Sequence, residues 1–188
     1  MTAFTTEKID VEPWFDMELF MGVSQETRLG GDVMDRFMTL WKNWLPHLTV
    51  KGIDTGKIKY LLVALDESVE QDVDKAWESS PSNAFLYNAL AQTMCMAAVH
   101  AVIPEVQDAG CAPAPKPTAT LREALEAEGI PYSNGKDPIL SRRYAVVTHY
   151  PFKGGCEICV LQSNCPKGQG QMEATSVVLP GYEHPQQM

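Results

Sequence analysis

Three of the chain's five cysteines fall within ten residues, in the stretch "CEICVLQSNC" from Cys156 to Cys165. Their spacing is Cys-x2-Cys-x5-Cys, with Cys159 in the middle, and the other two cysteines, Cys95 and Cys111, lie far upstream. Thiolates bind zinc and iron–sulfur clusters, and both kinds of site usually need four ligands. The stretch therefore predicts three ligands of a four-ligand metal site.

The arrangement of the cysteines bears on which metal is bound. A redox dithiol needs only two cysteines, and a structural zinc site usually pairs two short knuckles separated by a longer stretch. Here one Cys-x2-Cys pair is followed at once by a third cysteine, and no second pair appears. Three close thiolates with one distant partner are typical of iron–sulfur clusters. The pattern favours a cluster bound by Cys156, Cys159 and Cys165, with structural zinc and metal-free thiols as the alternatives.

This ending of the loop resembles a known metal motif. "CEICVLQSNC" is similar to the end of the iron–sulfur loop in the endonuclease III and adenine glycosylase family, to the ending in RecB-like iron–sulfur nucleases, and to that in auxiliary-cluster domains of radical SAM enzymes. The resemblance spans about 10 of 188 residues, and it implies a four-iron, four-sulfur cluster with Cys156, Cys159 and Cys165 as ligands. The catalytic motifs of these families are absent, so their activities do not carry over.

Three residues are candidates for the fourth ligand. Cys111 lies in a Pro- and Ala-rich loop that could fold over a cluster, and it is the favoured candidate. His149 stands where the glycosylase pattern has its first cysteine, although histidine is a rarer cluster ligand. Cys95 lies within an apolar helical stretch, where burial as a small hydrophobic residue is the expected role.

Charge limits the classes of partner. The net charge is −9; residues 1–110 hold 8 basic and 17 acidic residues, and residues 111–188 hold 7 of each. An acidic body does not suit a phosphate backbone, so no nucleic acid is expected. The acids between Asp66 and Asp74 are expected on a solvated helix face. Arg142 and Arg143 could offset a cluster's negative charge, dock an acidic partner or stay solvated.

The apolar pattern predicts a mainly helical fold. Helices are expected over 32–45, 58–77, 80–103 and 120–129, with a weaker one at 14–29, because apolar residues recur every three or four positions. Short strands are expected at 144–150 and 174–179. We expect a helical bundle-like body over 1–110, and a segment over 111–188 that packs a linker, a short helix, a strand and the cysteine loop on it.

The sequence therefore predicts a metal-binding protein, and it favours an iron–sulfur protein with a redox, sensing or structural role. The alternatives are a zinc-stapled helical module that binds a small molecule or protein, and an enzyme with its site between the body and the metal loop. A redox or protein partner is compatible with either metal. The chain shows no signal peptide and no membrane span, so a cytoplasmic location is expected. Oligomeric state stays open.

Overall fold

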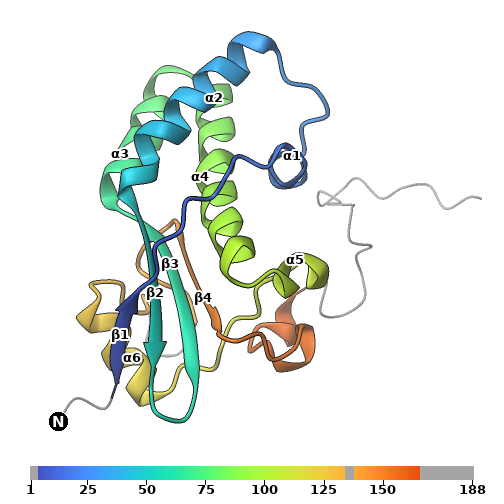
Figure 1. Ribbon diagram of the computed structural model, residues 1–188. Coiled ribbons are helices and arrows are strands. Elements are labelled where there is room, and N and C mark those ends of the chain that lie inside the picture. The colour runs from blue at the N-terminus through green and yellow to red at the C-terminus, as the bar shows by residue number, and fades with distance from the viewer. Residues whose placement is uncertain (1–3, 134–137, 166–188) are drawn as a thin grey trace, which may run out of the picture.

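The computed structural model describes residues 4–133 and 138–165 of the chain (Figure 1). The α-helices of this part are α1 (Met17–Ser24), α2 (Gly31–Trp44), α3 (Glu67–Ser79), α4 (Pro81–Val102), α5 (Glu105–Ala109) and α6 (Ala119–Ala127). The strands are β1 (Thr5–Lys8), β2 (Leu48–Asp54), β3 (Lys59–Leu65) and β4 (Ala145–His149). Three short 3-10 helices are η1 (Leu45–His47), η2 (Cys156–Ile158) and η3 (Gln162–Asn164).

The four strands form one antiparallel sheet with the order β1-β2-β3-β4. The pairs Leu48–Leu65 and Tyr60–His149 set the register of β3 against its two neighbours. β4 comes from the second half of the chain, and it adds an edge strand to a sheet whose other three strands lie within the first 65 residues. The cysteine loop follows β4 directly, so the sheet fixes where this loop begins.

The expected mainly helical, bundle-like fold is wrong, because the protein is a mixed α/β fold built on this sheet. The largest error is the predicted helix over 58–77, which is strand β3 followed by helix α3. Asp66 separates the two elements as the N-cap of α3, and its carboxylate accepts a hydrogen bond from the N–H of Ser68 at 2.9 Å. An entirely apolar run such as "YLLVAL" shows no periodicity, so a buried strand and a buried helix look alike in it.

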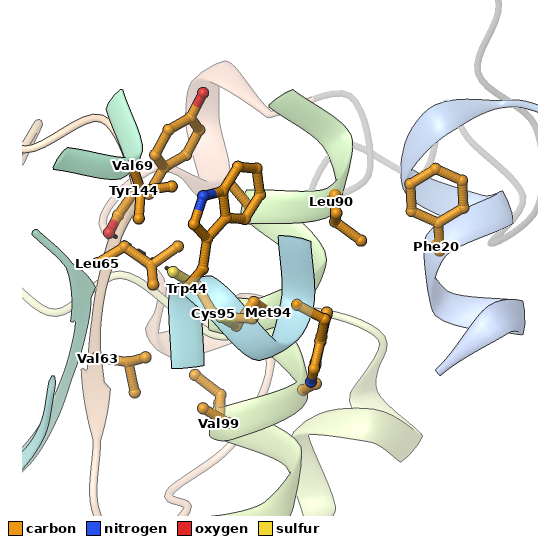
Figure 2. Packing of buried hydrophobic residues seen from close by; sticks show 14 of the residues in the cluster. Phe20, Trp44, Val63, Leu65, Val69, Leu90, Met94, Cys95, Val99 and Tyr144 are labelled. Carbon is orange, nitrogen blue, oxygen red and sulfur yellow. Dashed lines mark hydrogen bonds between the residues drawn. The ribbon is translucent and has the colours of Figure 1, made fainter. Parts of the chain in front are cut away.

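From Tyr60 to Leu65, β3 is apolar because both faces of the sheet are covered. Leu61 and Val63 belong to the larger core on the α4 side, which Figure 2 shows from close by. Tyr60 and Leu62 belong to a second core, which α6 closes with Leu121 and neighbouring residues. Strand residues alternate between the two faces, so a strand covered on both sides has no polar positions.

Several predicted helices are confirmed, with ends that follow ordinary capping rules. Ser80 caps α4, accepting a hydrogen bond from the N–H of Asn83 at 3.4 Å, and Pro81 is the first helical residue. The predicted helix at 120–129 is α6, which begins at Ala119 and has Thr118 as its cap. Gly129 has a φ of 73°, which suits the residue after a helix end.

Helix α4 is the centre of the larger core. Of the helices described, it alone is long and apolar enough to cross a membrane by length and composition, and half of its most apolar window is buried inside the protein. It packs against α1, α3 and β3, as the core helix of a folded domain does. The predicted strand at 144–150 is confirmed as β4, whereas the one at 174–179 lies outside the described residues.

Candidate metal centre

The cysteine loop is a succession of tight turns with a period of three residues. The N–H of Cys159 donates to the carbonyl oxygen of Cys156 at 3.1 Å, that of Gln162 to Cys159 at 3.1 Å, and that of Cys165 to Gln162 at 3.4 Å. A 3-10 helix has three residues per turn, so residues three apart lie on one side. The Cys-x2-Cys-x5-Cys spacing follows this period of three, and Cys156, Cys159 and Cys165 line one cavity together with Gln162 in the intervening position.

Two glycines begin this loop. Gly154 has a φ of 139°, a conformation that favours glycine, and a side chain there would meet the carboxylate of Glu157. The N–H of Gly155 donates to the Glu157 carboxylate at 2.9 Å. This contact closes the turn that precedes Cys156, and Gly154 is the position in this turn whose backbone favours glycine.

Cys111 reaches the loop from the other half of the chain. α5 ends at Gly110, which has a φ of 65°, and the chain then runs past β4 toward the cysteine loop. The hydroxyl of Thr148 donates to the carbonyl oxygen of Pro113 at 3.0 Å. The N–H of Val160 donates to the carbonyl oxygen of Ala114 at 3.0 Å. Figure 1 shows the cysteine loop beside α5, which explains how Cys111 reaches it.

The thiol-bearing residues Cys111, Cys156, Cys159 and Cys165 line one cavity together. The other residues that line it are Ala109, Pro113, Gly155 and Gln162. All four cysteines are half-buried, and among the residues that the structure describes no carboxylate contributes to the lining. The cavity measures about 20 Å³, which is room for about one water molecule. Four cysteines from two distant segments thus line one small, mainly apolar space.

The thiols do not converge on a single point. Around a tetrahedral zinc ion, thiolates at 2.3 Å from the metal stand about 3.8 Å from one another. Within residues 4–133 and 138–165, no three His, Cys, Asp or Glu side chains are grouped so that they could hold a metal ion. The four cysteines are thus neighbours around a shared space rather than a closed single-ion site.

Cys95 lies apart from this cavity, in the core. It is 2% exposed on α4, and its thiol donates to the carbonyl oxygen of Tyr144 at 3.5 Å (Figure 2). Burial raises the pKa of the Cys95 thiol to about 12. Cys95 therefore behaves as a small core residue, as the sequence suggested, and does not join the other four.

His149 faces away from the cysteine cavity. Strand residues alternate, so His149 shares the face of Val147 on the α6 side of the sheet, and its ring lies 5.4 Å from that of Tyr60. Its Nδ1 is buried, with no hydrogen-bond partner among the described residues. Burial, and then the charge of Lys153, hold the pKa of His149 below its usual value. His149, which the cysteine spacing suggested as a fourth ligand, is not among the described residues that line the cavity.

The basic residues before β4 bind the body rather than the cysteine loop. Arg143 donates to Asp74 at 2.8 Å, and Arg142 lies 3.8 Å from a carboxylate oxygen of Glu70. The acidic face of α3, which was predicted to be solvated, therefore also forms ion pairs with another segment of the chain. Arg142 and Arg143 attach the segment before β4 to α3.

Two features of the site escaped the sequence argument. One is the run of backbone hydrogen bonds that repeats every three residues through Gln162. The spacing of the cysteines, at multiples of three, could have indicated it. The other is the bond between Val160 and Ala114, which has no local signal because the two residues are 46 positions apart. Comparison of the chain with protein-family models, with curated proteins and with solved structures gives no match.

Proposed function

We propose that the chain binds a four-iron, four-sulfur cluster through Cys111, Cys156, Cys159 and Cys165, and that the cluster has a redox or sensing role. The observation that supports this proposal is the meeting of four thiols around one cavity. Cysteine thiolates are the usual ligands of such clusters, and each binds a different iron atom. The thiolates then stand further apart than around one ion, which agrees with four thiols that surround a space without converging.

The loop can adapt to a group larger than the cavity. Holding a cluster requires the cysteine side chains to turn outward from the centre of the 20 Å³ space. The three loop cysteines lie in short surface turns, where Val160 and Leu161 are 39% and 40% exposed. Because neither hydrophobic core includes this loop, such turning leaves the packing of the sheet unchanged.

The position of the site favours exchange of electrons with the surroundings. When bound, an iron–sulfur cluster supplies a centre that is oxidised and reduced by single electrons, with a potential set partly by solvent exposure. The half-buried ligands hold it at the surface, and the exposed Val160 and Leu161 lie beside it. A protein partner or a small oxidant could therefore reach this edge.

Ligation also has a structural consequence. Cys111 and Cys156 are 45 positions apart, so binding both to one group closes a long loop of the chain. Closing such a loop lowers the entropy of the unfolded state, and binding free energy becomes folding free energy. The metal-bound protein is therefore expected to unfold at a higher temperature than the metal-free form.

Zinc is the second candidate, favoured by the small volume of the cavity. Anaerobic purification followed by analysis of iron, acid-labile sulfide and zinc separates the two. The proposal expects about four iron and four sulfide per chain, with broad visible absorbance that dithionite bleaches. Stoichiometric zinc without sulfide in the anaerobic protein would overturn it.

The ligand set is tested by matched substitutions. Cys111→Ser is expected to lose most of the iron, whereas Cys95→Ser and His149→Asn retain it, because these two side chains lie outside the cavity. Full iron content in Cys111→Ser would remove Cys111 from the ligand set. Loss of iron in His149→Asn, in a variant that melts as the wild type does, would instead support the histidine.

A further inference from the structure

A cavity of about 230 Å³ lies on the sheet near the turn that joins β2 to β3. The residues that line it are Thr5, Glu7, Ile9, Gly52, Ile53, Asp54, Lys59 and Tyr150. They come from β1, β2 and β3 and from the positions just after β1 and β4. None of the described residues that line the cysteine cavity lines this one, so the two cavities are separate features.

The pairing of the strands places most of these side chains on one face of the sheet. Asp54 is paired with Thr5 on one side and with Lys59 on the other. The N–H of Tyr150 donates to the carbonyl oxygen of Lys59 at 3.0 Å, so Tyr150 extends the same row. Leu61, two positions after Lys59, belongs to the larger core, and residues two apart on a strand share a face. The cavity therefore lies on the α4 side of the sheet, where the β2–β3 hairpin extends past α4 (Figure 1).

Gly52 contributes to this cavity by having no side chain. It lies inside β2, paired with Glu7 of β1 and Leu61 of β3, and it is not among the described glycines with a positive φ. Among the described residues, a Cβ on Gly52 would meet only the Cδ1 of Ile9 at 3.7 Å and the carbonyl oxygen of Glu7 at 4.0 Å. Neither a turn nor a clash thus requires glycine here. Glycine inside a strand often marks the close approach of a ligand.

The charges of the lining do not cancel. The Nζ of Lys59 lies 3.1 Å from Oδ2 of Asp54, whose Oδ1 accepts a hydrogen bond from the N–H of Gly56 at 2.7 Å. The bond from Gly56, and then that from Lys59, hold the pKa of Asp54 below its usual value. Glu7 makes no side-chain hydrogen bond or ion pair with the described residues. Since Asp54 and Lys59 offset each other, Glu7 gives the cavity a net negative charge.

We propose that this cavity binds a small organic cation, a primary ammonium with an apolar body. The ammonium lies at Glu7, where it forms a charge-assisted hydrogen bond with the carboxylate. The apolar body lies against Ile9 and the ring of Tyr150, which line the same cavity. A concave site with apolar surface and a few polar groups is the usual form of a small-molecule site. The acidic residues of 1–110, which outnumber the basic ones by 17 to 8, attract cations to this body.

Other classes of ligand fit this lining less well. An anion would meet the carboxylate of Glu7, and it could use Lys59 only by breaking the ion pair with Asp54. Ca²⁺ takes about six to eight oxygen ligands, and among the described side chains the lining has carboxylates only at Glu7 and Asp54. A neutral apolar molecule would remove water from the Glu7 carboxylate without giving it a partner. An organic cation avoids all three costs.

An NMR titration of the full-length protein with hexylammonium tests the proposal. The backbone amides of Glu7, Gly52 and Lys59 are expected to shift and to saturate, with a dissociation constant on the order of 1 mM, as suits a ligand of few atoms. Hexanoate and hexanol have the same apolar chain with a negative or a neutral head, and they are expected to bind about tenfold more weakly. Ethylammonium, which lacks most of the apolar body, is also expected to bind about tenfold more weakly.

Two substitutions test where the cation binds. Gly52→Val places a side chain in the cavity, and valine favours strands, so this variant is expected to fold and to lose binding of hexylammonium. Glu7→Gln keeps the shape of an exposed side chain and removes its charge, and it is expected to weaken binding about tenfold. The matched control is Glu12→Gln, which removes the same charge at an exposed position outside the lining and leaves binding unchanged.

Three results would overturn the proposal. The first is the absence of a saturable shift with hexylammonium in the wild type. The second is binding of hexanoate as tightly as hexylammonium, since that would assign the cavity to anions through Lys59. The third is equal binding of hexylammonium by the wild type and by a Glu7→Gln variant that melts at the same temperature. This third comparison decides the matter even where Gly52→Val does not fold.

Discussion

The backbone N–H of Val160 donates to the carbonyl oxygen of Ala114 at 3.0 Å. This hydrogen bond joins the cysteine loop to the segment that begins with Cys111. It therefore links the two parts of the chain that contribute cysteines to the candidate metal centre. The hydroxyl of Thr148, bound to Pro113, attaches the same segment to β4. The sheet thus positions both halves of the site, although none of the four cysteines is part of it.

The Val160–Ala114 bond predicts a backbone substitution that weakens the site. Val160→Pro removes the N–H, whereas Val160→Ala keeps it and serves as the control. A lost hydrogen bond costs about 1 kcal/mol, so Cys111 in the metal-free protein is expected to alkylate about fivefold faster in Val160→Pro, and iron content should fall. Equal alkylation rates in the two variants would show that the bond does not hold Cys111 in place.

Because β3 is buried on both faces, substitutions at two adjacent residues are expected to lower the free energy of unfolding equally. Leu61 is 0% exposed in the core on the α4 side, and Leu62 is 1% exposed in the core on the α6 side. Each Leu→Ala substitution is expected to lower the free energy of unfolding by about 3 kcal/mol in urea denaturation. Lys59→Ala, at an exposed position of the same strand, is the control. A near-neutral Leu62→Ala would mean that α6 does not cover the sheet.

The position of Cys95 predicts a large difference in thiol reactivity. A pKa of about 12 leaves roughly one thiol in ten thousand ionised at pH 8, and the thiolate is the reactive form. In metal-free protein at pH 8, mass spectrometry should find the half-buried Cys159 alkylated by iodoacetamide much faster than the buried Cys95. Urea should abolish the difference. Rapid modification of Cys95 without denaturant would contradict its place in the core.

The cap of α3 predicts a loss of stability in acid. Burial acts to raise the pKa of Asp66, but hydrogen bonds from Ser68 and His47 outweigh it, and the pKa lies below its usual value. A lowered folded-state pKa contributes stability that is present above the unfolded value, about 3.9, and is lost as the pH falls through the folded value. The melting temperature should therefore drop below about pH 4.

Asp66→Asn isolates this contribution, because asparagine also caps helices but does not titrate. The variant is expected to be less stable than the wild type at pH 7, and the gap should narrow as the pH falls below 4. A gap that stays constant from pH 7 to pH 3 would show that the carboxylate charge of Asp66 has no role in stability.

Local features of the fold were predictable from the sequence. The cap of α4, the glycine after the end of α6 and the strand from Ala145 to His149 follow from residues within a few positions of one another. The sheet was not predictable as a whole. From Tyr60 to Leu65, β3 is apolar because helices cover both its faces, so the alternation that reveals a strand is absent where the strand is most buried.

The same division holds for the candidate metal centre. The three-residue period of Cys156, Cys159 and Cys165 is a local property, and the sequence by itself was enough to place these thiols together. The choice among Cys111, His149 and Cys95 depended on distant contacts. Which of these residues lines the cavity follows from the alternation of β4, which turns His149 toward Tyr60, and from the bond between Val160 and Ala114. Only the tertiary structure decides this, because neither contact is between chain neighbours.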